Sequence, residues 1–65
     1  MEFEEHLTLS RSEVAGRLHD LADQIAEGKL AIGKVETDVA ERVEYEVDFE
    51  VDHHKRELKI ELEWR

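Results

Sequence analysis

The chain contains no cysteine and no proline, and its three glycines are scattered. Without cysteine it has neither disulfides nor a thiolate metal site, two of the features that often stabilise small domains. The absence of cysteine also suits a reducing cytoplasm. Because there is no proline, no low-complexity segment and no repeat, the sequence offers no linker at which to divide it. We therefore expect residues 1–65 to form one small domain.

Long apolar runs and positive charge are also scarce. No stretch approaches the roughly 20 apolar residues that cross a bilayer. The acidic start Met1–Glu5 lacks the basic and apolar regions of a signal peptide. Nine Lys and Arg against 18 Asp and Glu give a formal net charge of −9, whereas nucleic acids and anionic membranes bind basic surfaces. We therefore expect a soluble cytoplasmic protein that contacts neither nucleic acid nor membrane directly.

The sequence also lacks the motifs that carry catalysis. It has no nucleophile beside a base, no glycine-rich phosphate loop and no basic aromatic patch. Carboxylates are abundant, but catalytic carboxylates need a cleft that removes them from water. We expect no enzymatic activity and no cofactor.

What the sequence does contain is two runs of strict alternation, Val43–Asp52 and Glu57–Trp64. In each run every second residue is apolar and the residues between are charged. A period of two gives a strand one apolar and one charged face, and the polar break Asp52–Arg56 has the length of a hairpin turn. We therefore predict a β-hairpin, with an apolar face made of Val43, Tyr45, Val47, Phe49, Val51, Leu58, Ile60, Leu62 and Trp64.

The N-terminal half predicts a strand followed by a helix. Phe3–Leu9 alternates closely enough for a strand. Ser10–Glu13 then forms a capping box, after which apolar residues recur with helical spacing until Gly28, the expected C-cap. Gly16 within the helix indicates either a close approach to a sheet, which we favour, or simple tolerance of glycine.

A further apolar segment, Leu30–Thr37, predicts another strand, in which Gly33 marks a bulge or a tight turn. The element order is then β-α-β-β-β. This is an α+β fold with one helix packed on a mostly antiparallel four-stranded sheet. A helix is only about 10 Å wide, too narrow to cover four strands of which the longest runs about 33 Å. We expect uncovered apolar surface at the Trp64 or Val51 end, and a second subunit as its cover.

Four segments resemble the amphi-Trp domain family. They are the helix start Leu9–Arg11, the helix segment Leu21–Gln24, the alternating Val43–Val47 and the terminal Glu57–Trp64. The family takes its name from an amphipathic end that closes on a tryptophan, and the resemblance covers nearly the whole chain. It implies a small prokaryotic domain that often stands alone. It implies no activity and no catalytic residues.

The charged face of the predicted hairpin is the first candidate interaction surface. Lys59 on this face is expected opposite a carboxylate, as a cross-strand ion pair. The acidity has three simple explanations, namely solubility, halophilic adaptation and an ordinary solvated sheet, and a sharper one, the docking of a basic protein or mimicry of a nucleic acid. The candidate residues are Glu44, Glu46, Asp48, Glu50, Glu61 and Glu63.

Trp64 and two adjacent histidines are the remaining candidates. Trp64 either packs in the core beside Leu62 or anchors a subunit or partner interface, because tryptophan is enriched in binding hot spots. His53 and His54 are competent ligands for Zn²⁺ or Ni²⁺. Adjacent histidines in a turn usually point apart, however, so a solvated turn is the simpler explanation and no metal site is assigned.

Together these observations predict a non-catalytic, acidic interaction domain. It is expected to self-associate as a homodimer through apolar surface that its helix leaves uncovered. The first alternative is an acidic docking or DNA-mimic module that binds a basic protein partner. The second is a minor metal or ligand site at His53 and His54.

Overall fold

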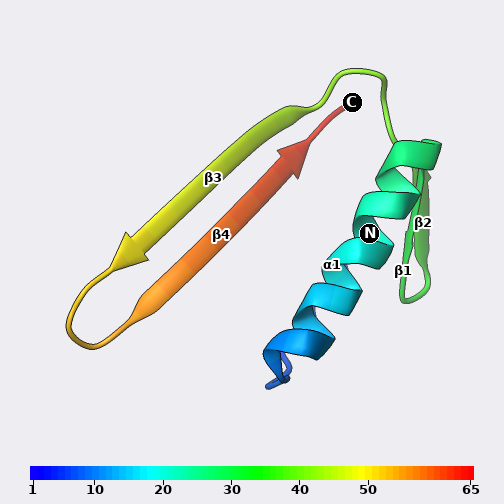
Figure 1. Cartoon of the computed structure of the whole chain (residues 1–65). Coiled ribbons are helices and arrows are strands. Elements are labelled where there is room, and N and C mark those ends of the chain that lie inside the picture. Colours follow the sequence, from blue (N-terminus) through cyan, green and yellow to red (C-terminus); the bar gives the residue numbers. More distant parts are fainter.

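The structure, a computed structural model, describes all residues from 1 to 65. The strands pair antiparallel in two separate two-stranded sheets, β1–β2 and β3–β4 (Figure 1). One helix precedes the four strands, so the predicted α+β class is confirmed. The elements are α1 (Arg11–Glu27), β1 (Lys29–Ile32), β2 (Val35–Asp38), β3 (Glu44–Val51) and β4 (Arg56–Glu63).

Helix α1 begins and ends where the sequence predicted. The Ser10 hydroxyl accepts a hydrogen bond from the Glu13 amide, and the Glu13 carboxylate accepts one from the Ser10 amide, each at 3.1 Å. Gly28 closes the helix with a φ of 87°, and its amide donates to the carbonyls of Gln24 and Ile25. Glycine adopts this left-handed conformation without steric strain. The helix is neither long nor apolar enough to span a membrane.

The N-terminal segment before α1 is not a strand, so the strand predicted over Phe3–Leu9 is wrong. Side chains hold the segment instead. The Phe3 ring lies against Gly33 in the turn between β1 and β2, and Arg17 Nη1 donates to Glu5 Oε1 at 3.3 Å. Alternation indicates an apolar face, but it does not supply a neighbouring strand edge to pair with. In this segment apolar packing on the β1–β2 turn takes the place of strand pairing.

The segment Leu30–Thr37, predicted as one strand, forms the two strands β1 and β2. Gly33 and Lys34 connect them, and Gly33 has a φ of 59°. Glycine at the first central position is the preference of type II′ hairpin turns. A side chain at this position would also collide with the Phe3 ring. The tight-turn interpretation of Gly33 is confirmed, and the number of strands remains four because this hairpin replaces the missing N-terminal strand.

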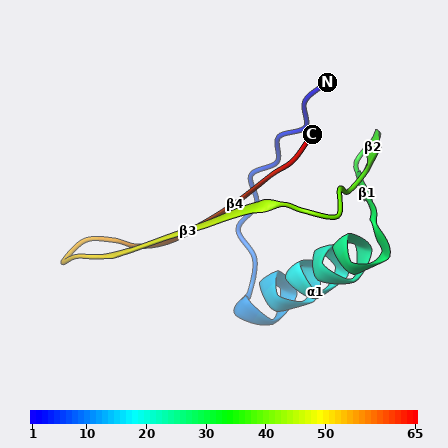
Figure 2. The same cartoon turned by 90° about the horizontal axis from the view of Figure 1, so that it is seen from above.

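The four strands do not form the single sheet that was predicted, and α1 does not cover β3 and β4. Helix α1 contacts β1, but none of its Cα atoms lies within 8 Å of β3 or β4. No Cα atom of β1 or β2 lies within 8 Å of β3 or β4 either. The β3–β4 hairpin and α1 diverge from the end of the molecule where β2 leads into β3 (Figure 1). Seen from above, the N-terminus lies on the side of the hairpin away from α1, and the N-terminal segment passes the hairpin to reach the start of the helix (Figure 2). The connection of residues 39–43 carries β3 away from the edge of β2.

Gly16 does not bring α1 close to a sheet. A Cβ atom added at this position would meet no heavy atom within 4 Å. The favoured interpretation of this glycine is therefore wrong, and it occupies an open position on the helix surface.

The result is a chain without a single buried residue. The half-buried apolar side chains come mainly from the second half of α1, from β1–β2 and from the base of the β3–β4 hairpin. The accessible surface is 6601 Å², whereas a compact chain of 7.6 kDa exposes about 4,300 Å². The radius of gyration of 13.6 Å likewise exceeds the value of about 10.7 Å for a compact chain of this length. The single chain is thus an open structure.

Two faces of the β3–β4 hairpin as candidate functional site

The β3–β4 hairpin sorts its side chains onto two faces of opposite character. Tyr45 lies opposite Leu62, and the apolar pairing continues with Val47 opposite Ile60. The intervening register positions hold the charged residues, because successive side chains of a strand point to opposite faces. The apolar face consists of Tyr45, Val47, Phe49, Val51, Leu58, Ile60 and Leu62. The acidic face consists of Glu44, Glu46, Asp48, Glu50, Glu57, Lys59, Glu61 and Glu63.

All seven side chains of the apolar face are exposed, including Tyr45 at 70% and Phe49 at 69% of their accessible surface. The sequence predicted uncovered apolar surface at the Trp64 or the Val51 end. Val51 is indeed exposed, whereas Trp64 is half-buried, and the bare surface extends along the whole hairpin. Burying one such side chain is worth about 1.5–3 kcal/mol. A contiguous apolar surface of this kind is typical of an interaction site.

The acidic face brings like charges together across the strands. Three of its four cross-strand pairs join two carboxylates: Glu44 with Glu63, Glu46 with Glu61, and Glu50 with Glu57. The fourth pair is Asp48 with Lys59, so Lys59 lies opposite a carboxylate as expected. The expected ion pair across the strands is not formed, and Lys59 Nζ lies instead 4.0 Å from Glu57 Oε1 on its own strand. Because directly opposed like charges destabilise a sheet, the pairs Glu44–Glu63 and Glu46–Glu61 are electrostatically unfavourable in the isolated chain, whereas Glu57 is compensated by Lys55 at 3.6 Å and by Lys59.

The Asp52 carboxylate closes the turn between β3 and β4. Its Oδ1 accepts hydrogen bonds from the amides of His54 and Lys55, each at 2.8 Å, and the Asp52 amide donates to the Lys55 carbonyl. This side-chain-closed turn takes the place of the glycine turn that tight hairpins prefer, and an aspartate at the start of the polar break was its signal in the sequence.

The two histidines of this turn, His53 and His54, are not part of a metal-binding cluster. Nowhere in the chain do three or more His, Cys, Asp or Glu residues gather in a way that could hold a metal ion. The neighbouring Asp52 Oδ1 is engaged by two backbone amides. A metal site at this turn has no geometric support.

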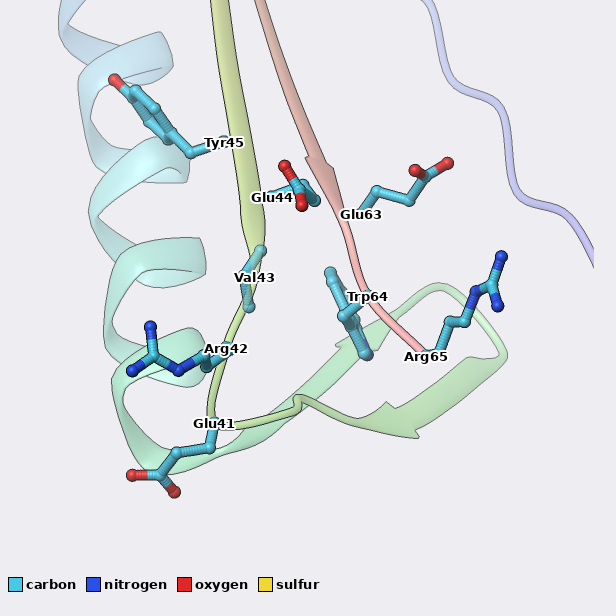
Figure 3. A pocket seen from close by; sticks show the side chains of 8 residues that line it. All are labelled: Glu41, Arg42, Val43, Glu44, Tyr45, Glu63, Trp64 and Arg65. Carbon is cyan, nitrogen blue, oxygen red and sulfur yellow. The ribbon is translucent and has the colours of Figure 1, made fainter.

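Trp64 connects the hairpin to the rest of the chain. Its Nε1 donates to the Asp38 carbonyl at 2.9 Å, which joins the end of β4 to the end of β2. Figure 3 shows its ring turned toward β1 and β2, whereas Glu63 and Arg65 extend to the other side. The half-buried Trp64 therefore has an internal role at the junction of the two sheets. Sequence reasoning missed the polar bond, because its acceptor is a backbone carbonyl far away in the chain.

An open hollow lies at this junction, and Tyr45 extends from it on the side of α1 (Figure 3). It is lined by Glu41, Arg42, Val43, Glu44, Tyr45, Glu63, Trp64 and Arg65. None of these side chains is buried. The hollow is therefore an open surface feature at the junction.

Comparison with known protein families gives a match over the full length of the chain. Residues 1–65 match the model of the Amphi-Trp domain. No curated protein and no solved structure matches the chain.

Proposed function

We propose that this chain, which belongs to the Amphi-Trp domain family, is a non-catalytic interaction domain that self-associates through the apolar face of its β3–β4 hairpin. The observation that carries the proposal is the exposure of all seven residues of that face in a chain with no buried residue. A two-stranded hairpin is at best marginally stable in water by itself. Since α1 does not cover this hairpin, another surface has to.

The amount of surface left exposed supports a homodimer. An unfolded chain of 7.6 kDa exposes about 11,000 Å², so the observed 6601 Å² corresponds to burial of about 40%. Domains of about 60 residues bury about 60% of their unfolded surface. With no cysteine for disulfides and no metal cluster, association is the remaining way to stabilise so small a domain. The lack of cysteine and the net charge of −9 suit a soluble cytoplasmic protein, and the resemblance to the family implies a prokaryotic one.

Two neighbouring residues of β4 provide a matched test, because Ile60 lies on the apolar face and Glu61 on the acidic face. Light scattering should give the unmodified chain a mass twice that of the 7.6 kDa chain. The Ile60→Asp variant should have the mass of one chain, because the substitution places a carboxylate in the interface. The Glu61→Gln variant should keep the doubled mass. A monomeric unmodified chain at all concentrations would remove the proposal.

The acidic face supports a second candidate function, the docking of a basic protein, including by mimicry of a nucleic acid. The specific observation is the three like-charged cross-strand pairs, which a cationic partner would relieve. Self-association through the apolar face leaves this face directed outward. The two functions are therefore compatible in one molecule.

The second candidate is tested by immobilising the chain and capturing the proteins that bind it from the source lysate at low and high salt. The captured protein, once identified and purified, should be basic, should dissociate at high salt and, for a nucleic-acid mimic, should be displaced by duplex DNA. The control is a variant that keeps the shape of the face but removes the charge of one strand: Glu44→Gln, Glu46→Gln, Asp48→Asn and Glu50→Gln. Equal binding by this variant would exclude docking on the acidic face.

A further inference from the structure

A second apolar surface is left bare on α1. Val14 and Leu18, one turn apart in the N-terminal half of the helix, are 43% and 48% exposed. Leu21 and Ile25, in the C-terminal half, are half-buried. Besides Phe3 and Leu7 of the N-terminal segment, which are also exposed, two structural elements carry exposed apolar surfaces: the apolar face of the hairpin and this part of α1. No Cα atom of α1 lies within 8 Å of the hairpin strands.

The hairpin is tied to the rest of the chain at the end of β4. The end of β4 is held by the hydrogen bond from Trp64 Nε1 to the Asp38 carbonyl. On the β3 side, the Val39 amide donates to the Gly28 carbonyl at 2.8 Å, five residues before the strand begins. The hairpin runs away from α1 (Figure 1). A second copy can reach both apolar surfaces while the Trp64 bond stays in place.

We infer that two copies interlock by exchanging hairpins, so that the apolar face of each β3–β4 hairpin packs on Val14 and Leu18 of the other copy. The inference rests on the proposed self-association and adds which surfaces meet. Each chain offers one surface of each kind, so a two-fold arrangement covers all four at once and closes as a dimer. Packing the two hairpins face to face would leave both helices bare.

The surface areas agree with an interlocked dimer. The chain exposes about 2,300 Å² more than a compact chain of its mass, or about 4,600 Å² for two chains. Obligate homodimers bury about 2,000–5,000 Å² in total, whereas standard interfaces bury about 1,600 Å². The surplus is thus too large for a small contact between two finished domains, and it is of the size expected when two chains complete each other's core.

Because the chain has no cysteine, single introduced cysteines can report which surfaces meet. Leu18→Cys and Ile60→Cys chains, carrying different tags, are refolded together and treated with a short bismaleimide. The expected product joins the two differently tagged chains. The matched control is Glu61→Cys in place of Ile60→Cys, which lies on the acidic face and should give little product with Leu18→Cys.

The other products would overturn the inference in distinguishable ways. A product formed by Ile60→Cys chains alone would show hairpins packed face to face. A doubly substituted chain that cross-links only within itself would show closure of each hairpin on its own helix. Light scattering of the same samples tests self-association separately from the exchange of hairpins. A chain-mass species removes the self-association itself, whereas a dimer without the Leu18–Ile60 product removes only the exchange of hairpins.

Discussion

Replacement of Phe49 by alanine should dissociate the dimer while changing the isolated chain little. Phe49 lies near the tip of the hairpin, opposite Leu58. In the isolated chain this pair contributes about 0.2–1 kcal/mol. A larger effect of the substitution therefore has to come from a surface that covers the ring.

The size of that effect follows from the exposure of the ring. An aromatic side chain offers roughly 200 Å² for burial, and Phe49 is 69% exposed, so about 140 Å² is left for a second copy to cover. At about 25 cal/mol per Å² this is worth about 3.5 kcal/mol. Alanine retains a small part of it, which leaves a loss of about 2–3 kcal/mol in each chain. Two such losses raise the dissociation constant of the dimer about a thousandfold or more.

Sedimentation over a dilution series measures this dissociation constant directly. The matched control is Glu50→Ala, the neighbouring residue on the acidic face, which removes one carboxylate from a like-charged pair with Glu57 and should not weaken the dimer. If Phe49→Ala and the unmodified chain dissociate at the same concentration, Phe49 is not part of the interface and the reasoning from exposure is refuted.

Three further substitutions test local parts of the account. Ser10→Ala removes the hydroxyl that caps α1 and should lower the unfolding free energy by about 1 kcal/mol in a urea titration; an unchanged midpoint would contradict the cap. Hydrogen bonds from the backbone and then the side chain of Ser10 lower the pKa of Glu13. The resulting stabilisation is present above the unfolded pKa of this carboxyl and is lost as the pH falls through the folded one. Ser10→Ala should therefore leave Glu13 with a smaller downward pKa shift in an NMR titration. Gly16→Ala should raise the unfolding free energy by up to about 1 kcal/mol, seen as a higher melting temperature; destabilisation would reveal a surface packed on this glycine. Glu46→Lys turns the pair with Glu61 into one of opposite charges and should stabilise the chain by a few tenths of a kcal/mol. That gain should shrink as salt is added, and a gain that is independent of salt would contradict its electrostatic origin.

The features that the sequence predicts correctly are those with local signals. The Ser10 and Gly28 caps lie next to the helix that they delimit, so the bounds of α1 are readable from the sequence. The membership of the two hairpin faces follows from the parity of residues in each strand. The pairing of Glu50 with Glu57 required the register as well, which the parity of residues in each strand does not supply.

The features that the sequence does not predict depend on contacts between distant segments. Alternation in Phe3–Leu9 indicates an apolar face but not its neighbour, which is the turn at Gly33 rather than a strand. Four amphipathic strands suggest one sheet by number alone, yet β2 and β3 diverge after Asp38. The acceptor for Trp64 is the carbonyl of that same Asp38, and no residue type signals a backbone acceptor. These outcomes arise from tertiary geometry, which residue patterns describe only in part.

Hydrogen exchange of the β3–β4 amides at two protein concentrations tests most directly whether a second copy covers the apolar face. A hairpin that stands alone opens readily and protects its amides weakly. In a self-associated chain the β3–β4 amides should be strongly protected, and this protection should fall on dilution because dissociation uncovers the apolar face. Weak protection that is the same at both concentrations would contradict the claim that this hairpin is the self-association surface.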